Sequence, residues 1–341
     1  MAIITLNRCP STLQEGFDKY SPSALKYLTD GKPVSCILPY DVLGSDRDAQ
    51  AEIQQGSGRL SLSGAQAKFS MILDERPDET GMYHFRFARP EQRGQYILKP
   101  APLSLSIIDR PDCPANEHLS MQLASQVYGI ETAANALCFF QDGTPAYITR
   151  RFDLKSDGSK YAMEDFASLG GYTRANGGSD FKYCNASYEE CTDMIRRYVK
   201  AAPVEILKFF RILLFDYIIS NSDAHLKNFS LIERQPNDYM LSPSYDLLNT
   251  FLHLAEPTVF ALDKGLFREG WPKGDVHSVD RNTFTEFGQR IGLPPRLVSK
   301  EIDRFASDYP LAIALIEHSF LSDASKRLYL QTFNYRRSTL R

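Results

Sequence analysis

The sequence predicts an α+β protein with two lobes, in which a β-rich N-terminal part with one helix precedes a mostly helical C-terminal part. Two observations support this fold class: apolar and polar side chains alternate in short segments between residues 61 and 99, and helical patterns prevail after Glu164. The 341 residues are enough for one large domain or two lobes. We expect the N-terminal lobe at residues 1–150 and the C-terminal lobe at residues 151–341, with a cleft between them where a ligand would bind.

The N-terminal lobe is predicted to be an antiparallel meander followed by a helix and a second strand pair. The meander strands are expected at residues 67–73, 82–87 and 95–99. Asn116 is the predicted N-cap of the helix, because Asn favours this position and apolar side chains follow at helical spacing until Gly129. The second strand pair is expected at residues 136–140 and 146–152, around a turn at 141–144.

The C-terminal lobe is predicted from one buried helix, one hairpin and a run of amphipathic helices. Residues 204–219 form the most apolar segment, but four charged residues interrupt it. A membrane span needs about 20 mostly apolar residues, so we expect a core helix here and no membrane contact. The hairpin strands are expected at residues 229–233 and 239–241, and amphipathic helices between residues 283 and 337.

The composition argues against several classes of protein. Lys and Arg number 39 against 42 Asp and Glu, and a net charge of −3 argues against a general nucleic-acid binder, whose affinity depends on a basic surface. The six cysteines are scattered, without a C-x-x-C pair, so we expect neither a zinc site nor a disulfide framework. No secretory signal peptide is predicted at the N-terminus. The simplest expectation is a protein of a reducing compartment, the cytoplasm.

The polar segment 221–228 follows directly on the predicted core helix. Asp223 and Asn228 have the D-x-x-x-x-N spacing of protein kinases, in which the aspartate accepts the proton of the substrate hydroxyl and the asparagine holds a magnesium ion. Asp223 is therefore the candidate base, and Lys227 is expected near the transferred phosphate, where its charge would offset that of the phosphate. The alternative is a cluster of helix-end and turn residues, because Asn, Ser and Asp favour those positions.

A second acid, Asp246, follows the predicted hairpin at the place where kinases have the metal-binding aspartate of their D-F-G segment. Magnesium prefers carboxylates, waters and phosphate oxygens, so Asp246 together with Asn228 is chemically sufficient for a magnesium site. The segment Asp246-Leu-Leu lacks the phenylalanine of D-F-G, and no switch based on that residue is predicted. The alternative is a turn aspartate at the end of a strand.

Other candidates lie in the N-terminal lobe. Lys99 ends a strand, like the kinase lysine that binds the α- and β-phosphates, and Glu117 in the next helix can pair with it. Upstream, a loop with Gly64 precedes a strand, and its backbone amides can cradle a phosphate. The alternatives are a solvated edge lysine and a simple hairpin turn. In the candidate catalytic loop, His225 is expected to orient the backbone rather than to react.

An ordered set of segments resembles the HipA family of serine/threonine kinases, which act as toxins in toxin–antitoxin modules. The segments are residues 61–68 (SLSGAQAK), 96–100 (YILKP), 116–117 (NE), 151–153 (RFD), 164–166 (EDF), 223–230 (DAHLKNFS) and 242–246 (SPSYD). The resemblance covers about residues 55–330. It implies a two-lobed protein-kinase-like (HipA-like) fold, with ATP and Mg²⁺ as cofactors.

The resemblance also implies roles for individual residues. Asp223 is the catalytic base, with Lys227 beside it, and Asn228 and Asp246 are the magnesium ligands. The implied ATP-binding residues are Gly64, Ala65, Gln66, Lys68, Lys99, Glu117, Arg150, Phe152, His225, Asn228 and Asp246. Residues 150–152 would line the adenine as the hinge between the lobes. Arg150 stands where the family often has an acidic residue, so only backbone contacts are implied for it.

The chain differs from full-length HipA proteins because only about 60 residues precede the glycine loop. This resembles the short HipT toxins of three-part HipBST modules, in which a separate small protein, HipS, resembles the subdomain that HipT lacks. The implied partners are a HipB-like DNA-binding antitoxin, through which alone the chain would meet DNA, and a HipS-like protein. Ser61 and Ser63 match a site of autophosphorylation. The implied target is an aminoacyl-tRNA synthetase, with tryptophanyl-tRNA synthetase as the best guess.

Two alternatives remain open. Kinase-like folds also phosphorylate small molecules, and nothing but the family resemblance separates the two substrate classes. A weakly active ATP-binding interaction protein is the other alternative. The candidate residues Lys99, Asp223, Asn228 and Asp246, all present in the chain, speak against it.

Overall fold

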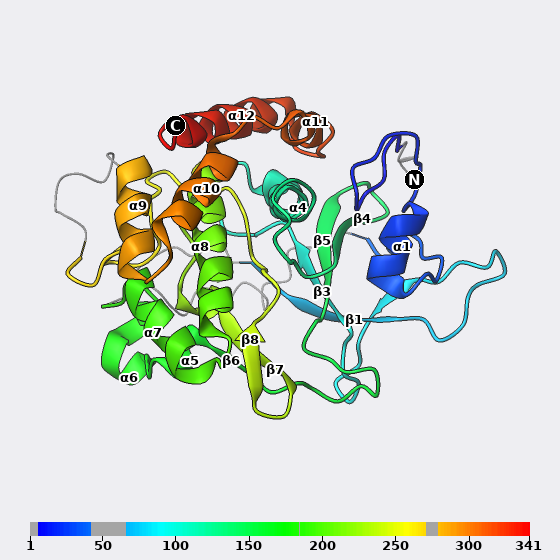
Figure 1. Ribbon diagram of the computed structural model, residues 1–341. Coiled ribbons are helices and arrows are strands. Elements are labelled where there is room, and N and C mark those ends of the chain that lie inside the picture. Colours follow the sequence, from blue (N-terminus) through cyan, green and yellow to red (C-terminus); the bar gives the residue numbers. More distant parts are fainter. Residues whose placement is uncertain (1–5, 42–65, 184, 271–278) are drawn as a thin grey trace.

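The structure is a computed structural model that describes residues 6–41, 66–183, 185–270 and 279–341 (Figure 1). Its N-terminal half is built around an antiparallel sheet with the strand order β2-β1-β3-β5-β4. The strands are β1 (Phe69–Leu73), β2 (Phe85–Phe87), β3 (Tyr96–Pro100), β4 (Asn135–Phe139) and β5 (Pro145–Arg150). All the predicted strands of this half are confirmed, with ends that differ by at most three residues.

Strand alternation decides which face of the sheet receives each side chain. Leu98 and Ile148 face one side, where the helix α1 (Pro22–Thr29) packs in a common apolar cluster. Lys99 and its cross-strand partner Tyr147 face the opposite side, where α4 lies. The position of Lys99 in β3 thus directs its side chain toward α4.

Helix α4 (Cys113–Gln122) is buried along its whole length. The prediction that Asn116 is its N-cap is wrong, because the helix already begins at Cys113. Pro114 lies in the first turn, where its missing N–H costs nothing. Asn116 lies inside the helix, and its side chain bonds the backbone of Asn249, donating to the carbonyl at 2.8 Å and accepting from the N–H at 2.9 Å. The side chain of Asn116 therefore does not cap the helix but connects α4 to the segment around Asn249.

The C-terminal half is mainly helical and surrounds α8 (Ala202–Ile218) (Figure 1). The other helices are α5 (Phe166–Leu169), α6 (Arg174–Gly177), α7 (Tyr188–Tyr198), α9 (Arg281–Arg290), α10 (Pro295–Ala306), α11 (Pro310–Glu317) and α12 (Asp323–Ser338). A small sheet, in the order β6-β7-β8, contains β6 (Met163–Asp165), β7 (Ser230–Gln235) and β8 (Asp238–Leu241). Both the core helix and the hairpin are confirmed. No helix in the four described ranges combines the length and the apolar character needed to cross a membrane.

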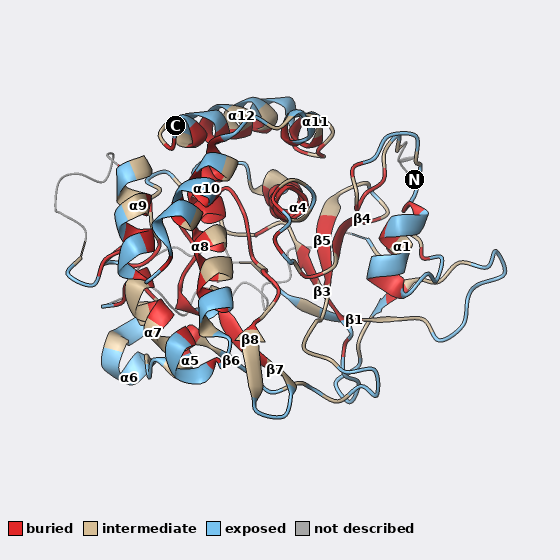
Figure 2. Cartoon of the chain, viewed as in Figure 1, coloured by how far each residue is buried: buried red, intermediate tan, exposed pale blue. Residues whose placement is uncertain are grey.

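Short helical turns connect these elements. They are η1 (Arg110–Asp112), the π-helical turn η2 (Leu123–Val127), η3 (Gly178–Asp180), η4 (Leu226–Asn228) and η5 (Thr250–Leu252). Figure 2 shows the buried residues concentrated in the strands, in α4 and on the inner sides of the helices around α8. The largest apolar cluster extends from α4 into α8, α10 and α12, so the two halves share a core. The lobe boundary between residues 150 and 151 stays a prediction.

Candidate active site

The site begins with a buried cluster of one lysine and two carboxylates from three separate elements. Lys99 on β3 places its Nζ 2.5 Å from Oε1 of Glu117 on α4. The same Nζ also donates to Oδ1 of Asp246, which lies after β8. All three residues are less than 10% exposed. The structure thus brings together three residues that the sequence analysis singled out at separations of 18 and 147 positions.

Burial and the neighbouring charges together determine the pKa values in this cluster. Burial opposes the charge of the Lys99 ammonium, but the two carboxylates outweigh it and raise the pKa of Lys99. Burial, assisted by the charge of Asp246, raises the pKa of Glu117 to about 7 in spite of Lys99. The lysine is therefore held firmly in its charged form, and a nucleotide phosphate would meet a fixed cation.

The backbone of Asp246 directs its carboxylate into the cluster. Its φ is +55°, in the left-handed region that aspartate tolerates better than most residues. Lys68, after the loop that contains Gly64, places its Nζ 3.5 Å from Oδ2 of Asp246. Gln66 donates from Nε2 to the carbonyl of Pro100 at 2.8 Å, next to Lys99. These predicted nucleotide residues lie together, while Gly64, Ala65, Ser61 and Ser63 lie outside the described residues.

The candidate catalytic loop leaves α8 through a tight turn. Asn221 connects the helix to the loop, because its Nδ2 donates to Oδ1 of Asp216 at 2.8 Å and its Oδ1 accepts the N–H of Asp223 at 3.2 Å. Ser220, just before it, has a φ of +58°. The buried helix therefore determines where Asp223 stands.

Two rings lie beside the carboxylate of Asp223, and one of them donates a hydrogen bond to it. The hydroxyl of Tyr183 donates to Oδ1 of Asp223 at 2.6 Å. Nε2 of His225 lies 4.0 Å from the same oxygen, and the His225 ring packs edge-on against Tyr183 with 5.1 Å between the ring centroids. Burial lowers the pKa of His225 to about 4, so the imidazole is neutral at pH 7. A structural role for His225 fits these contacts.

Asn228 follows on the turn η4 and is half-buried. Its Nδ2 donates to the carbonyl of Asp223 at 2.8 Å. This commits the nitrogen as a donor and leaves Oδ1 as the atom that can bind a cation. A carboxylate on Asp246 and an amide oxygen on Asn228 are oxygen donors of the kind that Mg²⁺ prefers, so these residues fit a magnesium ion that arrives with a nucleotide.

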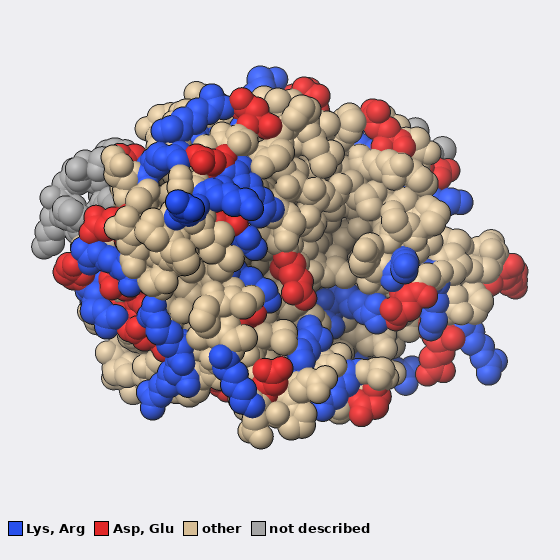
Figure 3. All heavy atoms as spheres, viewed as in Figure 1, with Lys and Arg blue, Asp and Glu red and all other residues tan. Residues whose placement is uncertain are grey.

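Two further lysines lie in the candidate catalytic loop or bond to it: Lys227 belongs to the loop, and the carbonyl of Lys182 accepts from the N–H of Leu226 at 3.1 Å. Lys227 is half-exposed and its Nζ is 3.5 Å from Oδ2 of Asp165 at the end of β6, so its place beside a transferred phosphate stays a prediction. Lys182 was missed by the sequence analysis. Its charge interacts with Asp223 and Asp246, and burial lowers its pKa. Figure 3 shows basic side chains gathered at the margin of a hollow near the middle of one face, where an anion would be attracted.

The predicted hinge residues differ in where their side chains point. Arg150 forms a two-pronged ion pair with Asp30, at 2.7 and 2.6 Å, and so reaches toward α1. Phe152 packs against the ring of Tyr245, the neighbour of Asp246, at 5.7 Å between centroids. The backbone N–H of Arg150 donates to the carbonyl of Ala134 at 2.8 Å, so the contact of this residue with a nucleotide stays a prediction. The ring of Phe152 lies beside the predicted metal-binding segment.

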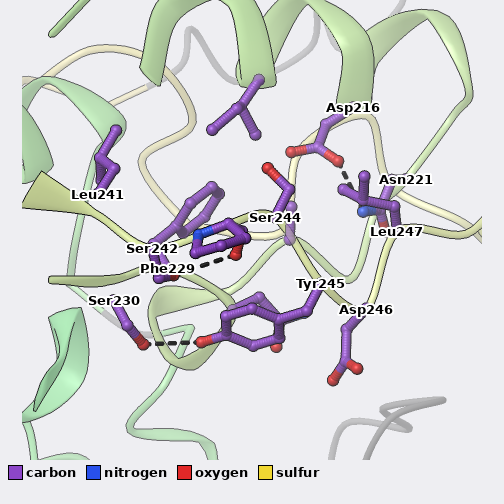
Figure 4. A pocket seen from close by; sticks show the side chains of 14 residues that line it. Asp216, Asn221, Phe229, Ser230, Leu241, Ser242, Ser244, Tyr245, Asp246 and Leu247 are labelled. Atoms are coloured by element: carbon purple, nitrogen blue, oxygen red, sulfur yellow. Dashed lines mark hydrogen bonds between the residues drawn. The ribbon is translucent and has the colours of Figure 1, made fainter. Parts of the chain in front are cut away.

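A pocket with a mainly apolar lining and a few polar side chains lies between the end of α8 and the segment after β8 (Figure 4). Asp216, Asn221, Ser244 and Asp246 are among its lining residues. Oδ2 of Asp216 and Oγ of Ser244 are buried without a hydrogen-bond partner among the described residues. Burial raises the pKa of Asp216 to about 7. In the sequence, Asp216 stands out only as a charged residue that interrupts an apolar helix. Neighbours such as Ser244 come from a segment that follows later in the chain, so a helical pattern does not reveal them.

Comparison with known proteins agrees with this geometry. The family model of the HipA-like C-terminal domain matches residues 60–313. A protein of Haemophilus influenzae with the name "Putative kinase" is 25% identical over 97% of this chain and 95% of its own length. The serine/threonine-protein kinase toxin HipA of Shewanella oneidensis is 25% identical over 77% of this chain, which spans only 58% of that relative.

The fold is also similar to a solved structure. HipA in the Shewanella oneidensis complex of HipA, HipB and operator DNA matches with a TM-score of 0.62 at 22% identity, over 85% of this chain and 66% of that one. At this identity the likeness concerns the fold. The predicted α+β, two-lobed, kinase-like architecture is confirmed.

Proposed function

The chain belongs to the family of HipA-like C-terminal domains, and from this premise we propose that it is an ATP-dependent kinase that phosphorylates serine or threonine in proteins. The observation that carries the proposal is the buried contact of Lys99 with both Glu117 and Asp246. Protein kinases need such a lysine–glutamate pair beside the metal-binding aspartate to hold the phosphates of ATP. Burying three charges without such a use would be costly.

The residues divide the reaction between them. Lys99 and Lys68 would bind the phosphates. Asn228 and Asp246 would hold Mg²⁺, which neutralises charge that develops on the phosphate oxygens. Asp223 would accept the proton of the acceptor hydroxyl while the acceptor oxygen bonds to the γ-phosphorus. The bond from that phosphorus to the bridging oxygen breaks, and ADP leaves.

The biological setting is proposed from the relatives. HipA of Shewanella oneidensis was solved with HipB and operator DNA, and we propose a HipB-like antitoxin and a HipS-like small protein as partners of this chain. We further propose that the chain acts as a toxin that phosphorylates an aminoacyl-tRNA synthetase, with tryptophanyl-tRNA synthetase as the first candidate, and halts translation. Autophosphorylation at Ser61 or Ser63 belongs to the same proposal, and a phosphate there would repel ATP.

The test is phosphoryl transfer from γ-labelled ATP with Mg²⁺ to a bacterial protein extract, and separately to a panel of purified aminoacyl-tRNA synthetases. We expect one dominant labelled protein, with phosphoserine or phosphothreonine after hydrolysis. The matched control is Asp223→Asn, which keeps the shape of the side chain but cannot accept the proton. Label that appears only on small molecules would favour the small-molecule kinase. ATP binding without any transfer would favour the interaction protein.

A further inference from the structure

We propose that Thr250 is a positioning residue of the proposed kinase reaction: its hydroxyl fixes the catalytic loop relative to the segment that carries Asp246. This inference rests on the proposed function. Thr250 follows shortly after Asp246, begins the turn η5 and is fully buried. Its side chain bonds the loop that carries Asp223, and the residue before it bonds α4.

The hydroxyl of Thr250 bonds the turn that leads into the catalytic loop. Its Oγ1 donates to the carbonyl of Ser220 at 2.8 Å and accepts from the N–H of Ser222 at 2.9 Å. Oγ of Ser222 lies 2.8 Å from the same oxygen and acts as the donor, because the proton of Thr250 is used by Ser220. The hydroxyl therefore uses its one proton and both lone pairs on the two residues that flank Asn221, directly before Asp223.

The turn that Thr250 bonds has an unfavourable backbone conformation. Ser220 has a φ of +58°, in the left-handed region that costs a serine free energy. Such a conformation persists only where the surrounding structure holds it. The carbonyl of Ser220 accepts both from the hydroxyl of Thr250 and from its backbone N–H, the latter at 3.1 Å. Without the hydroxyl the turn is free to relax, and Asp223 would move with it.

The residue before Thr250 is fixed to the nucleotide end of the site. Asn116 on α4 donates to the carbonyl of Asn249 at 2.8 Å and accepts from its N–H at 2.9 Å, and both residues are fully buried. Asn116 is the neighbour in sequence of Glu117, which bonds Lys99. An amide that bonds both polar groups of one backbone residue determines its orientation as well as its position. Asn249 and Thr250 thus connect α4 with the catalytic loop.

This connection has a consequence for phosphoryl transfer. The proposed base Asp223 would hold the acceptor hydroxyl, whereas Lys99 and Asp246 would hold the phosphates from separate elements. Transfer requires the acceptor oxygen in line with the γ-phosphorus, so the distance between these groups has to be set before the reaction. The bonds of Thr250 set it from within the protein, without contact with either substrate.

The experiment measures the single-turnover rate of phosphoryl transfer at saturating ATP, and the equilibrium Kd of ATP, for the full chain and its variants. Thr250→Val keeps the shape of the side chain and removes the hydroxyl. We expect its transfer rate to fall roughly 10- to 100-fold, the effect of a small misplacement of the reacting groups. The Kd of ATP should stay unchanged, because the bonds between Asn116 and Asn249 remain. Thr250→Ser restores the hydroxyl and should transfer at close to the wild-type rate.

A second buried threonine offers a matched control. Thr192 on α7 is fully buried, and its hydroxyl donates to the carbonyl of Glu189 at 2.8 Å. Thr192→Val should transfer at the wild-type rate. Rates are expressed per chain that binds ATP, so that unfolded protein does not count as lost activity. If Thr250→Val does not fold, Thr250→Ala provides the same test, because it removes the hydroxyl without placing a methyl group against the polar turn.

A double-mutant cycle separates positioning from general damage to the fold. If Thr250 acts through the base, adding Thr250→Val to Asp223→Asn leaves the residual rate of Asp223→Asn nearly unchanged. A further loss of the same size in the double variant overturns the inference. So does a wild-type rate in Thr250→Val, an equal loss in Thr192→Val, or a rate in Thr250→Ser as low as in Thr250→Val. A wild-type chain that binds ATP but transfers no phosphate would overturn the proposed function as well, whereas active wild type beside an equally active Thr250→Val overturns the inference alone.

Discussion

The two ends of the candidate active site are held together by different forces. At the proposed nucleotide end, Lys99, Glu117 and Asp246 come from β3, α4 and the segment after β8, and ion pairs join them. At the proposed acceptor end, Asp223 is held by the neutral hydroxyl of Tyr183 and, at its backbone, by the side-chain amides of Asn221 and Asn228. The ion pairs of Lys99 can be exchanged for contacts with phosphates when a nucleotide binds. The hydrogen bond from Tyr183 is directional and favours one orientation of the Asp223 carboxylate.

The largest effect that separates the two ends is expected from Asp223→Ala. Without the carboxylate the acceptor proton has no base, so transfer should fall by about 10²–10⁴-fold. The Kd of ATP should stay near the wild-type value, because the base of a kinase contacts the acceptor hydroxyl and not the phosphates of ATP. Rate and Kd are measured on the same preparation. If Asp223→Ala loses ATP binding, Asp223 contributes to nucleotide binding and the two ends do not have separate roles.

Lys99→Met is the corresponding test of the nucleotide end. It removes the cation between two buried carboxylates, so we expect weaker ATP binding and a loss of about 3–5 kcal/mol in the free energy of unfolding. Adding Glu117→Gln removes one of the uncompensated charges and should restore part of the stability, but not ATP binding. Urea unfolding and ATP titration measure the two quantities. Unchanged stability in Lys99→Met would show that the charges are not coupled as the structure indicates.

Asp216 gives a pH-dependent prediction for the helix that supports the catalytic loop. Burial raises its pKa from 3.8 to about 7, so its contribution to stability is present below pH 4 and is lost as the pH rises to 7. Asp216→Asn keeps the acceptor for Asn221 and has no charge. Relative to wild type, this variant should gain stability between pH 5 and pH 8, by at most about 4 kcal/mol. The free energy of unfolding is measured for both proteins at pH 5 and pH 8. The same difference between variant and wild type at the two pH values would contradict this.

The smallest effect is expected at the predicted hinge. The Arg150–Asp30 pair is partly exposed, with side-chain exposures of 35% and 71%, and such pairs contribute about 0.2–1 kcal/mol. Arg150→Ala should therefore cost less than about 1 kcal/mol in stability and leave the Kd of ATP unchanged. A clear loss of ATP affinity would assign the side chain a role in the cleft that its contact with Asp30 does not suggest.

The two ends also differ in how far the sequence predicts them. Lys99, Glu117 and Asp246 stand at recognisable positions, a strand end, a helix and the segment after a hairpin, and the structure brings them together. Tyr183 lies in an irregular segment 40 residues before Asp223 and belongs to no recognisable motif. Its contact with Asp223 depends on the tertiary structure, which local sequence patterns do not reveal.

The errors in the predicted fold also arise where tertiary contacts or short elements override a local pattern. Asn116 has a strong local preference for a cap, but its side chain is used by Asn249, more than a hundred residues away. Helix α1 was not predicted, although Ser21 caps it and Pro22 begins it, because the helix has only 8 residues and its apolar residues do not form a long pattern. Long periodic segments such as α8 were predicted because burial dominates them.

The most direct test of the central claim compares the wild-type chain with Asp246→Ala in one assay of Mg²⁺-dependent ATP binding and γ-phosphoryl transfer. We predict that the wild type binds ATP and transfers its γ-phosphate to serine or threonine. Asp246→Ala should lose both properties, because the oxygen donor for the metal and one partner of Lys99 are gone. Transfer near the wild-type rate by Asp246→Ala would contradict the assignment of this cluster as the nucleotide site of a kinase.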